Sequence, residues 1–299
     1  MTRYESAVDF DRIEGIDVHV HVERDAHGHL SLDSELMAAS AAYFSADDNR
    51  TPSIDEVADH YRQRRLACVV FTVDAQTATG HRPISSVEVA EGAARHPDVL
   101  IPFGSVDPWA DDAVAQARRL VQECGVRGFK FHPSLQGFAP NDPRFAELFA
   151  ELERLGTIVL VHTGQTGIGA GLPGGRGIKL RYSEPMLLDD LAADFPGLTF
   201  ILAHPAVPWV DQSISMATHK ANVFLDLSGW SPKYFPPQLV RAANSYLRHK
   251  VLFGSDYPVI TPDRWLRDFA ELDLKPEVRE LILKRNAAGL LAPRPGAVT

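Results

Sequence analysis

The sequence is poor in cysteine, with only Cys68 and Cys124 among its 299 residues. Two thiols cannot form a disulfide framework or a cysteine-rich zinc site, so both kinds of site are excluded. Cys68 lies inside an apolar run, and Cys124 lies near the end of a helical pattern. We therefore expect both side chains to be packed thiols.

Long apolar runs and long basic runs are also missing. No stretch reaches the roughly 18 uncharged apolar residues of a membrane span, and the first 15 residues carry four acidic side chains. The sequence thus predicts neither a membrane span nor a signal peptide, and it predicts a cytoplasmic location. Acidic residues outnumber basic ones by 39 to 30, which gives a net charge of −9. We expect no nucleic-acid partner.

The chain does contain enough apolar sequence for a large core. Hydrophobic residues make up 45% of it and charged residues 23%, as in globular proteins. Eight short β-rich segments recur, and they are too apolar on both faces for a half-exposed antiparallel sheet. These expected strands span residues 15–21, 66–74, 100–107, 126–133, 158–164, 198–205, 223–229 and 251–258.

Helical patterns separate the expected strands, for instance at residues 111–123, 143–155 and 183–195. Eight strands that alternate with helices predict an α/β protein with a closed parallel (β/α)8 barrel, the TIM-barrel fold. We expect one domain over residues 1–299. Its loop insertions at about 22–52 and 165–182 should lie on the C-terminal face of the barrel, and the tail 293–299 should be frayed.

Histidines and one aspartate stand at the ends of these strands. His19 and His21 form a His-x-His pair whose side chains project to the same side of the first strand. His162, His204 and Asp256 end the fifth, sixth and eighth strands. Any one histidine alone on a buried strand is usually a satisfied core residue. Their joint placement at one barrel mouth favours a site for a divalent ion, held by neutral imidazoles and a carboxylate.

This constellation resembles the amidohydrolase superfamily, in particular the branch that includes aminocarboxymuconate semialdehyde decarboxylase. The resemblance covers the strand ends over residues 15–258 and continues into KRNA at 284–287, which is similar to the closing helix of that family. It implies a metal-dependent hydrolase type of barrel with one divalent ion, zinc first and manganese second. The metal ligands that it implies are His19, His21, His162 and Asp256.

The same resemblance implies catalytic roles. His204 matches the catalytic histidine of the branch, and Asp256 matches a base that takes a proton from metal-bound water. The family usually continues the sixth strand as H-x-G, whereas this chain has His204-Pro205-Ala206. This departure changes the shape of the backbone that follows His204.

Lys130 and His132 share one face at the end of the fourth strand. In binuclear members of the superfamily a lysine at this place is carbamylated and bridges two metals. The alternative is a cationic Lys130 that binds a substrate oxygen, with His132 as a nearby proton donor. We favour this mononuclear interpretation, and a lysine that merely pairs with a carboxylate remains a third.

Substrate contacts are expected from two loops. Residues 169–174 match GxGxxG, but Pro173 and further glycines argue against the helix that a dinucleotide site needs. The segment reads instead as a flexible lid whose basic residues could bind an anionic substrate or remain solvated. Trp230, Tyr234 and Phe235 follow the seventh strand and could form an apolar wall. The expected substrate-binding residues are thus Arg176, Lys179, Arg181, Trp230 and Tyr234.

Longer stretches, such as GFKFHPSLQGF and LFGSDYPVITPDRW, are similar to hydrolases that act on aryl β-ketoacyl-CoA thioesters. This similarity implies C–C bond cleavage by attack of metal-bound hydroxide on the keto carbon, with His204 or His132 supplying a proton. One alternative is a non-oxidative decarboxylase of an aromatic or semialdehyde carboxylate. Another is a metal-binding barrel without turnover. We expect a small-molecule substrate, a CoA thioester among the candidates, and a homo-oligomer.

Overall fold

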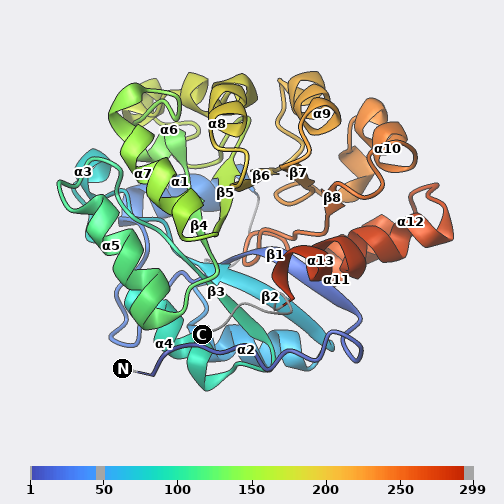
Figure 1. The fold of residues 1–299 in the computed structure, drawn as a ribbon, viewed down its shortest axis with the longest axis horizontal. Helices are drawn as coiled ribbons and strands as arrows, with labels where there is room; N and C mark the ends of the chain where they lie inside the picture. The colour runs from blue at the N-terminus through green and yellow to red at the C-terminus, as the bar shows by residue number, and fades with distance from the viewer. Residues whose placement is uncertain (1, 45–50, 293–299) are drawn as a thin grey trace.

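Eight parallel strands form one sheet in the order β1 to β8 in a computed structural model that describes residues 2–44 and 51–292. The expected (β/α)8 barrel is confirmed (Figure 1). The strands are β1 Gly15–His21, β2 Leu66–Phe71, β3 Leu100–Gly104, β4 Gly128–Phe131, β5 Ile158–His162, β6 Thr199–Ala203, β7 Val223–Asp226 and β8 Val251–Leu252.

The segment after β8 closes the barrel against β1. The backbone N–H of Val18 donates to the carbonyl of Phe253 (2.9 Å), and that of His21 donates to the carbonyl of Tyr257 (2.8 Å). In the other direction, the N–H of Asp256 donates to the carbonyl of His19 (3.0 Å). Asp256 is therefore fixed beside the His-x-His pair by backbone bonds.

Helices surround the sheet (Figure 1). The longer α-helices are α1 Ser34–Tyr43, α2 Ile54–Arg62, α4 Ser86–Arg95, α5 Ala113–Arg119, α7 Ala146–Arg154, α8 Asp189–Asp194, α9 Val210–His219, α10 Pro237–Ala243, α11 Pro262–Ala270, α12 Pro276–Glu280 and α13 Asn286–Leu291, with short α3 Gln76–Thr79 and α6 Pro133–Gln136. Two π-turns, η1 Leu120–Cys124 and η7 Leu281–Arg285, extend α5 and α12. The expected helices 143–155 and 183–195 begin as 3-10 turns, Pro143–Phe145 and Pro185–Leu188.

Two apolar layers result from strands that are buried on both faces. Side chains such as Val18, Val69 and Leu160 fill the barrel interior, while the alternate residues of the same strands pack against the helices. Cys68 and Cys124 are buried, as expected. The inner layer forms a solid floor, so polar strand-end residues can gather only at the mouth.

Both insertions contain secondary structure. The first holds α1, whose N-cap Asp33 accepts hydrogen bonds from two backbone N–H groups. The second holds the 3-10 turns η3 Pro173–Gly177 and η4 Leu180–Ser183, and its residues 174–176 have positive φ, so no dinucleotide-binding helix opens there. The tail 293–299 lies outside the described residues.

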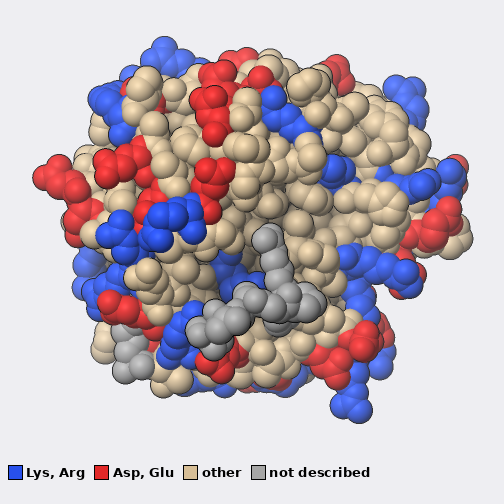
Figure 2. All heavy atoms as spheres, viewed as in Figure 1, with Lys and Arg blue, Asp and Glu red and all other residues tan. Residues whose placement is uncertain are grey.

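The outer surface mixes charges of both signs on the face shown in Figure 2. Among the residues that the structure describes, no helix has the length and apolar character needed to cross a bilayer.

Candidate active site

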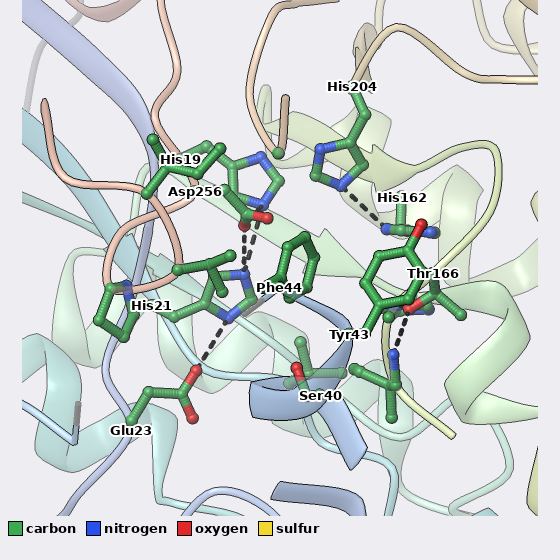
Figure 3. Close-up of a pocket in the computed structure, with 18 of the residues that line it drawn as sticks. His19, His21, Glu23, Ser40, Tyr43, Phe44, His162, Thr166, His204 and Asp256 are labelled. Atoms are coloured by element: carbon green, nitrogen blue, oxygen red, sulfur yellow. Dashed lines mark hydrogen bonds and ion pairs between the residues drawn. The ribbon is translucent and has the colours of Figure 1, made fainter. Parts of the chain in front are cut away.

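His19, His21 and Asp256 converge at the mouth of the barrel (Figure 3). Each side chain offers one ligand atom, and the three atoms lie within 4.8 Å of one another. Asp256 Oδ1 is 3.2 Å from the Nε2 atoms of both histidines, which are 3.3 Å apart. The strand alternation of β1 thus places both imidazoles on one side, as the sequence predicts.

The carboxylate of Asp226, at the end of β7, fixes the orientation of His19. Nδ1 of His19 lies 2.6 Å from Asp226 Oδ2, and both side chains are fully buried. A carboxylate can only accept, so His19 carries its proton on Nδ1 and turns the Nε2 lone pair toward the mouth. Gly254 makes room for this carboxylate, because a Cβ at that position would overlap Asp226 Oδ1.

Ser228 extends this chain of hydrogen bonds to His204 and His162. Its hydroxyl donates to Asp226 Oδ2 (2.8 Å), so Ser228 Oγ accepts from Nδ1 of His204 (2.9 Å). Neutral His204 then accepts on Nε2 from His162 Nδ1 (3.0 Å). This leaves a lone pair on His162 Nε2, which is buried and has no hydrogen-bond partner within residues 2–44 and 51–292.

Both His204 and Asp256 lie just beyond a strand, in the left-handed region of the backbone. Their φ angles are 71° and 69°, values that non-glycine residues rarely adopt. Gly229, with φ of 74°, allows the close approach of His204, because a Cβ there would lie 2.6 Å from its Nδ1. Strained backbone of this kind clusters at functional sites. The expected strands 198–205 and 251–258 are therefore too long, since β6 ends at Ala203 and β8 at Leu252.

The charge states of these side chains suit a divalent cation. Burial, followed by the charge of Lys130, lowers the pKa of His19 well below its usual value, so its imidazole is neutral. Burial alone would raise the pKa of Asp256, but His19, His21 and His204 hold it below its usual range, so the carboxylate is ionised. The imidazoles of His19 and His21 and the carboxylate of Asp256 are ligands that zinc and manganese accept. His162, predicted as a fourth ligand, is not in this group of three, but its Nε2 lone pair is unpartnered among the described residues. The residues present therefore fit one metal ion.

Lys130 approaches the same group from β4. Its Nζ is 3.0 Å from His19 Nε2 and 5.0 Å from the centre of the Phe71 ring. The side chain is buried, and burial lowers its pKa although Asp256 and Asp226 lie nearby. Lys130 is thus positioned to donate to an oxygen that binds beside the histidines.

A cavity of about 360 Å³ opens in front of this group. Polar side chains line its floor, and its walls are mostly apolar. The wall residues include Met37, Tyr43, Phe44, Leu135, Ile168, Trp230, Tyr234 and Ile260. The rings of Tyr43 and Phe44 are seen in front of the strand ends in Figure 3. Trp230 and Tyr234 thus lie where the sequence places them, while Phe235 is buried among the helices.

The three basic residues of the second insertion do not line this cavity. Nη1 of Arg176 contacts Asp33 (2.8 Å) and Glu35 (2.9 Å) at the start of α1, so its charge is paired. Arg176 and Lys179 line a second cavity of about 240 Å³, which shares Leu135 with the first. Arg181 and Lys179 lie over the ring of Tyr182 and lower the pKa of its hydroxyl.

The sequence of the chain matches the family model described as amidohydrolase over residues 16–292. This match spans nearly the whole barrel. The chain belongs to the amidohydrolase family. No curated protein matches its sequence closely enough to count as a relative.

Solved structures share the fold of this amidohydrolase. An uncharacterised TIM-barrel protein from Bordetella bronchiseptica is 24% identical, with a TM-score of 0.77 over 94% of this chain and 99% of that one. A 2,6-dihydroxybenzoate decarboxylase from Rhizobium is 17% identical, with a TM-score of 0.65 over 93% and 98%. A 5-carboxyvanillate decarboxylase from Novosphingobium aromaticivorans with bound manganese is 13% identical, with a TM-score of 0.65 over 96% and 99%.

Several residues of this amidohydrolase site are not predicted from the sequence. Asp226 and Ser228 carry a signal that could have found them, because Asp226 ends the seventh strand just as the histidines end others. Tyr43, Phe44 and Thr166 lie in the insertions, where no periodic pattern predicts which side chains face the cavity.

We expect Asp226→Asn to weaken metal binding by about 10- to 100-fold. The amide keeps the shape of the side chain but removes the charge that holds the proton of His19 on Nδ1. A competition titration with a chromogenic chelator measures this loss, and Asp211→Asn at the exposed start of α9 is the control. An unchanged metal affinity in D226N would show that the carboxylate does not support the site.

Proposed function

We propose that this amidohydrolase is a metal-dependent lyase that removes the carboxyl group, without oxidation, from an aromatic or semialdehyde carboxylate. One observation carries the proposal: His204 lies beside the group His19, His21 and Asp256, at the floor of a cavity with apolar walls. The volume of about 360 Å³ is at the low end for ligand pockets. It therefore suits an acid with a single ring. Decarboxylases with the same fold support this choice.

A divalent ion held by His19, His21, Asp256 and His162 would supply the positive charge that binds and orients the anionic oxygens of the substrate. Lys130, with Nζ 3.0 Å from His19 Nε2, donates to one of these oxygens. The aromatic walls hold the ring of the substrate and exclude water.

His204 moves the proton that replaces the carboxyl group. Ser228 orients the ring by accepting from Nδ1, so His204 takes up a second proton, from water, at Nε2, where this proton replaces the hydrogen bond from His162 Nδ1. The bond between the carboxyl carbon and the ring carbon breaks, and its electron pair stays on the ring carbon. That carbon takes the proton from His204 Nε2, and carbon dioxide leaves.

Hydrolysis of an aryl β-ketoacyl-CoA thioester is the second candidate. It is favoured by two basic residues, Lys179 at the second cavity and Arg181 two positions further on. Unlike Arg176, neither has a carboxylate partner among the described residues. Leu135 lines both cavities, so they are neighbours, and a long substrate would have to pass this side chain to occupy both. The first cavity by itself is too small to enclose a whole CoA thioester, which is why we rank this function second.

Product analysis in oxygen-18 water separates the two functions. We expect the metal-loaded protein to release one carbon dioxide per substrate from a member of a panel of hydroxybenzoates and semialdehyde acids. The product of a hydroxybenzoate should contain no oxygen-18, and in heavy water it should carry one deuterium at the vacated carbon. Labelled carboxylate from an aryl β-ketoacyl thioester, without carbon dioxide, would overturn the proposal in favour of hydrolysis. Inactivity on both this acid panel and a panel of aryl β-ketoacyl thioesters would favour a metal-binding barrel without turnover.

A further inference from the structure

His132 presents its two ring nitrogens to different partners. The residue follows β4 and is the N-cap of α6, and its Nδ1 accepts a hydrogen bond from the backbone N–H of Leu135 (3.2 Å). A backbone amide can only donate, so Nδ1 must carry a lone pair. In the neutral ring the proton then resides on Nε2, which is 3.3 Å from Thr166 Oγ1 in the second insertion.

The position of this ring is fixed from several sides. Its backbone N–H donates to Gln136 Oε1 (2.8 Å), and the Gln136 amide in turn donates to the carbonyls of Asp74 and Val106. The ring of His132 stacks on that of His162, with centroids 3.7 Å apart and planes 9° apart. The side chain is buried but lines the cavity. Nε2–H is therefore a rigidly placed donor at the cavity wall.

A second proton on this ring is disfavoured by geometry. It would have to bind at Nδ1, where it would break the hydrogen bond from the backbone N–H of Leu135. The N–H of the ring and the N–H of Leu135 would then face each other. A ring in this state is poorly suited to give up a proton, because the neutral imidazole would have to become an anion.

We propose that His132 is a catalytic residue that acts as a neutral hydrogen-bond donor, whose Nε2–H leaves Thr166 and binds an anionic oxygen of the substrate. This revises the expected role of His132 as a proton donor. The identity of this oxygen, as part of a carboxylate or phenolate, rests on the proposed function. The tautomer of His132 rests only on its hydrogen bonds. A rigid donor of this kind needs no reorganisation when negative charge builds up on the oxygen.

Two amide variants separate donation from proton transfer. In His132→Gln the side-chain amide nitrogen reaches about as far as imidazole Nε2, so the donor is kept. In His132→Asn the amide oxygen falls near the place of Nδ1, so the cap of α6 is kept but the donor is lost. We expect H132Q to retain kcat within about tenfold, with an unchanged pH profile. We expect H132N to lose about 10²- to 10³-fold of kcat, as when one oxyanion donor is removed. Comparable large losses in both variants, or no loss in H132N, would overturn the proposal.

A readout without turnover tests the tautomer itself. In protein labelled with nitrogen-15 at histidine, the His132 signals are identified by their absence in H132N. We expect a proton on Nε2 and none on Nδ1. A proton on Nδ1 would overturn the inference even if the protein proves to be a decarboxylase. The expected spectrum in a protein that is inactive on both panels would instead contradict only the proposed function.

Binding of benzoate, a probe with one carboxylate, gives the third measurement. By calorimetry, benzoate should bind the metal-loaded wild type and H132Q with similar affinity and H132N about tenfold more weakly, a difference of about 1.4 kcal/mol. Equal affinity in all three proteins would place the oxygen-binding role elsewhere.

Discussion

Replacing His19 and His21 together with alanine is expected to remove the bound metal and to lower kcat by about three orders of magnitude or more. These two imidazoles supply two of the three ligand atoms that lie within 4.8 Å of one another. With both gone, Asp256 and His162 cannot retain an ion, because a site that loses two ligands keeps neither its charge pattern nor its geometry. Elemental analysis of the purified proteins measures the metal, and a wild-type ratio near one ion per chain is expected.

The chain offers a matched control for this variant. His27 and His29 form a second His-x-His pair only a few residues further on. His29 uses its Nε2 to bond the carbonyl of Arg82, and its ring stacks on His81, away from the cavity. The H27A/H29A double variant should therefore keep its metal. Full metal content in H19A/H21A would refute the site, and loss of metal in both double variants would point to a general effect of the segment.

The contrast between these two pairs shows what local spacing can predict. Both read as His-x-His, but the first is on a buried strand of a barrel and the second is in an insertion. Strand alternation together with the convergence of parallel strands was enough to place His19, His21 and Asp256 at one mouth. The same rule applied to the end of β7 would also have found Asp226.

The remaining features depend on contacts between residues that are far apart in the sequence. Tyr43 and Phe44, which line the cavity, pack against Gly167. A Cβ at Gly167 would come within 2.5 Å of the Phe44 ring. Arg176 joins the same two insertions through Asp33. No periodic pattern encodes such pairs, so the sequence suggested substrate contacts for Arg176 where the structure gives it an ion pair. The sequence does not predict the left-handed backbone at His204 either, because non-glycine residues rarely adopt it.

The left-handed backbone at His204 makes asparagine a suitable replacement for this residue. Asparagine tolerates a φ of 71° better than most residues, so the substitution should remove the imidazole with little added strain. We expect kcat to fall by about 10²- to 10⁴-fold, the contribution typical of a positioned acid or base. Metal content should stay near that of the wild type, because Nε2 of His204 bonds His162 and its Nδ1 bonds Ser228.

The combination of a lost rate and a retained metal is what distinguishes a proton carrier from a ligand. Kinetics and elemental analysis are therefore made on the same preparation, with His219→Asn at the exposed end of α9 as the control. If metal and rate fall together, His204 holds the ion and the proton must come from another group. If the rate is unchanged, the hydrogen bonds from Asp226 through Ser228 serve only to orient His19. The expected result leaves His204 Nε2 as the atom that gives the vacated carbon its proton, because His132 keeps its own proton for binding.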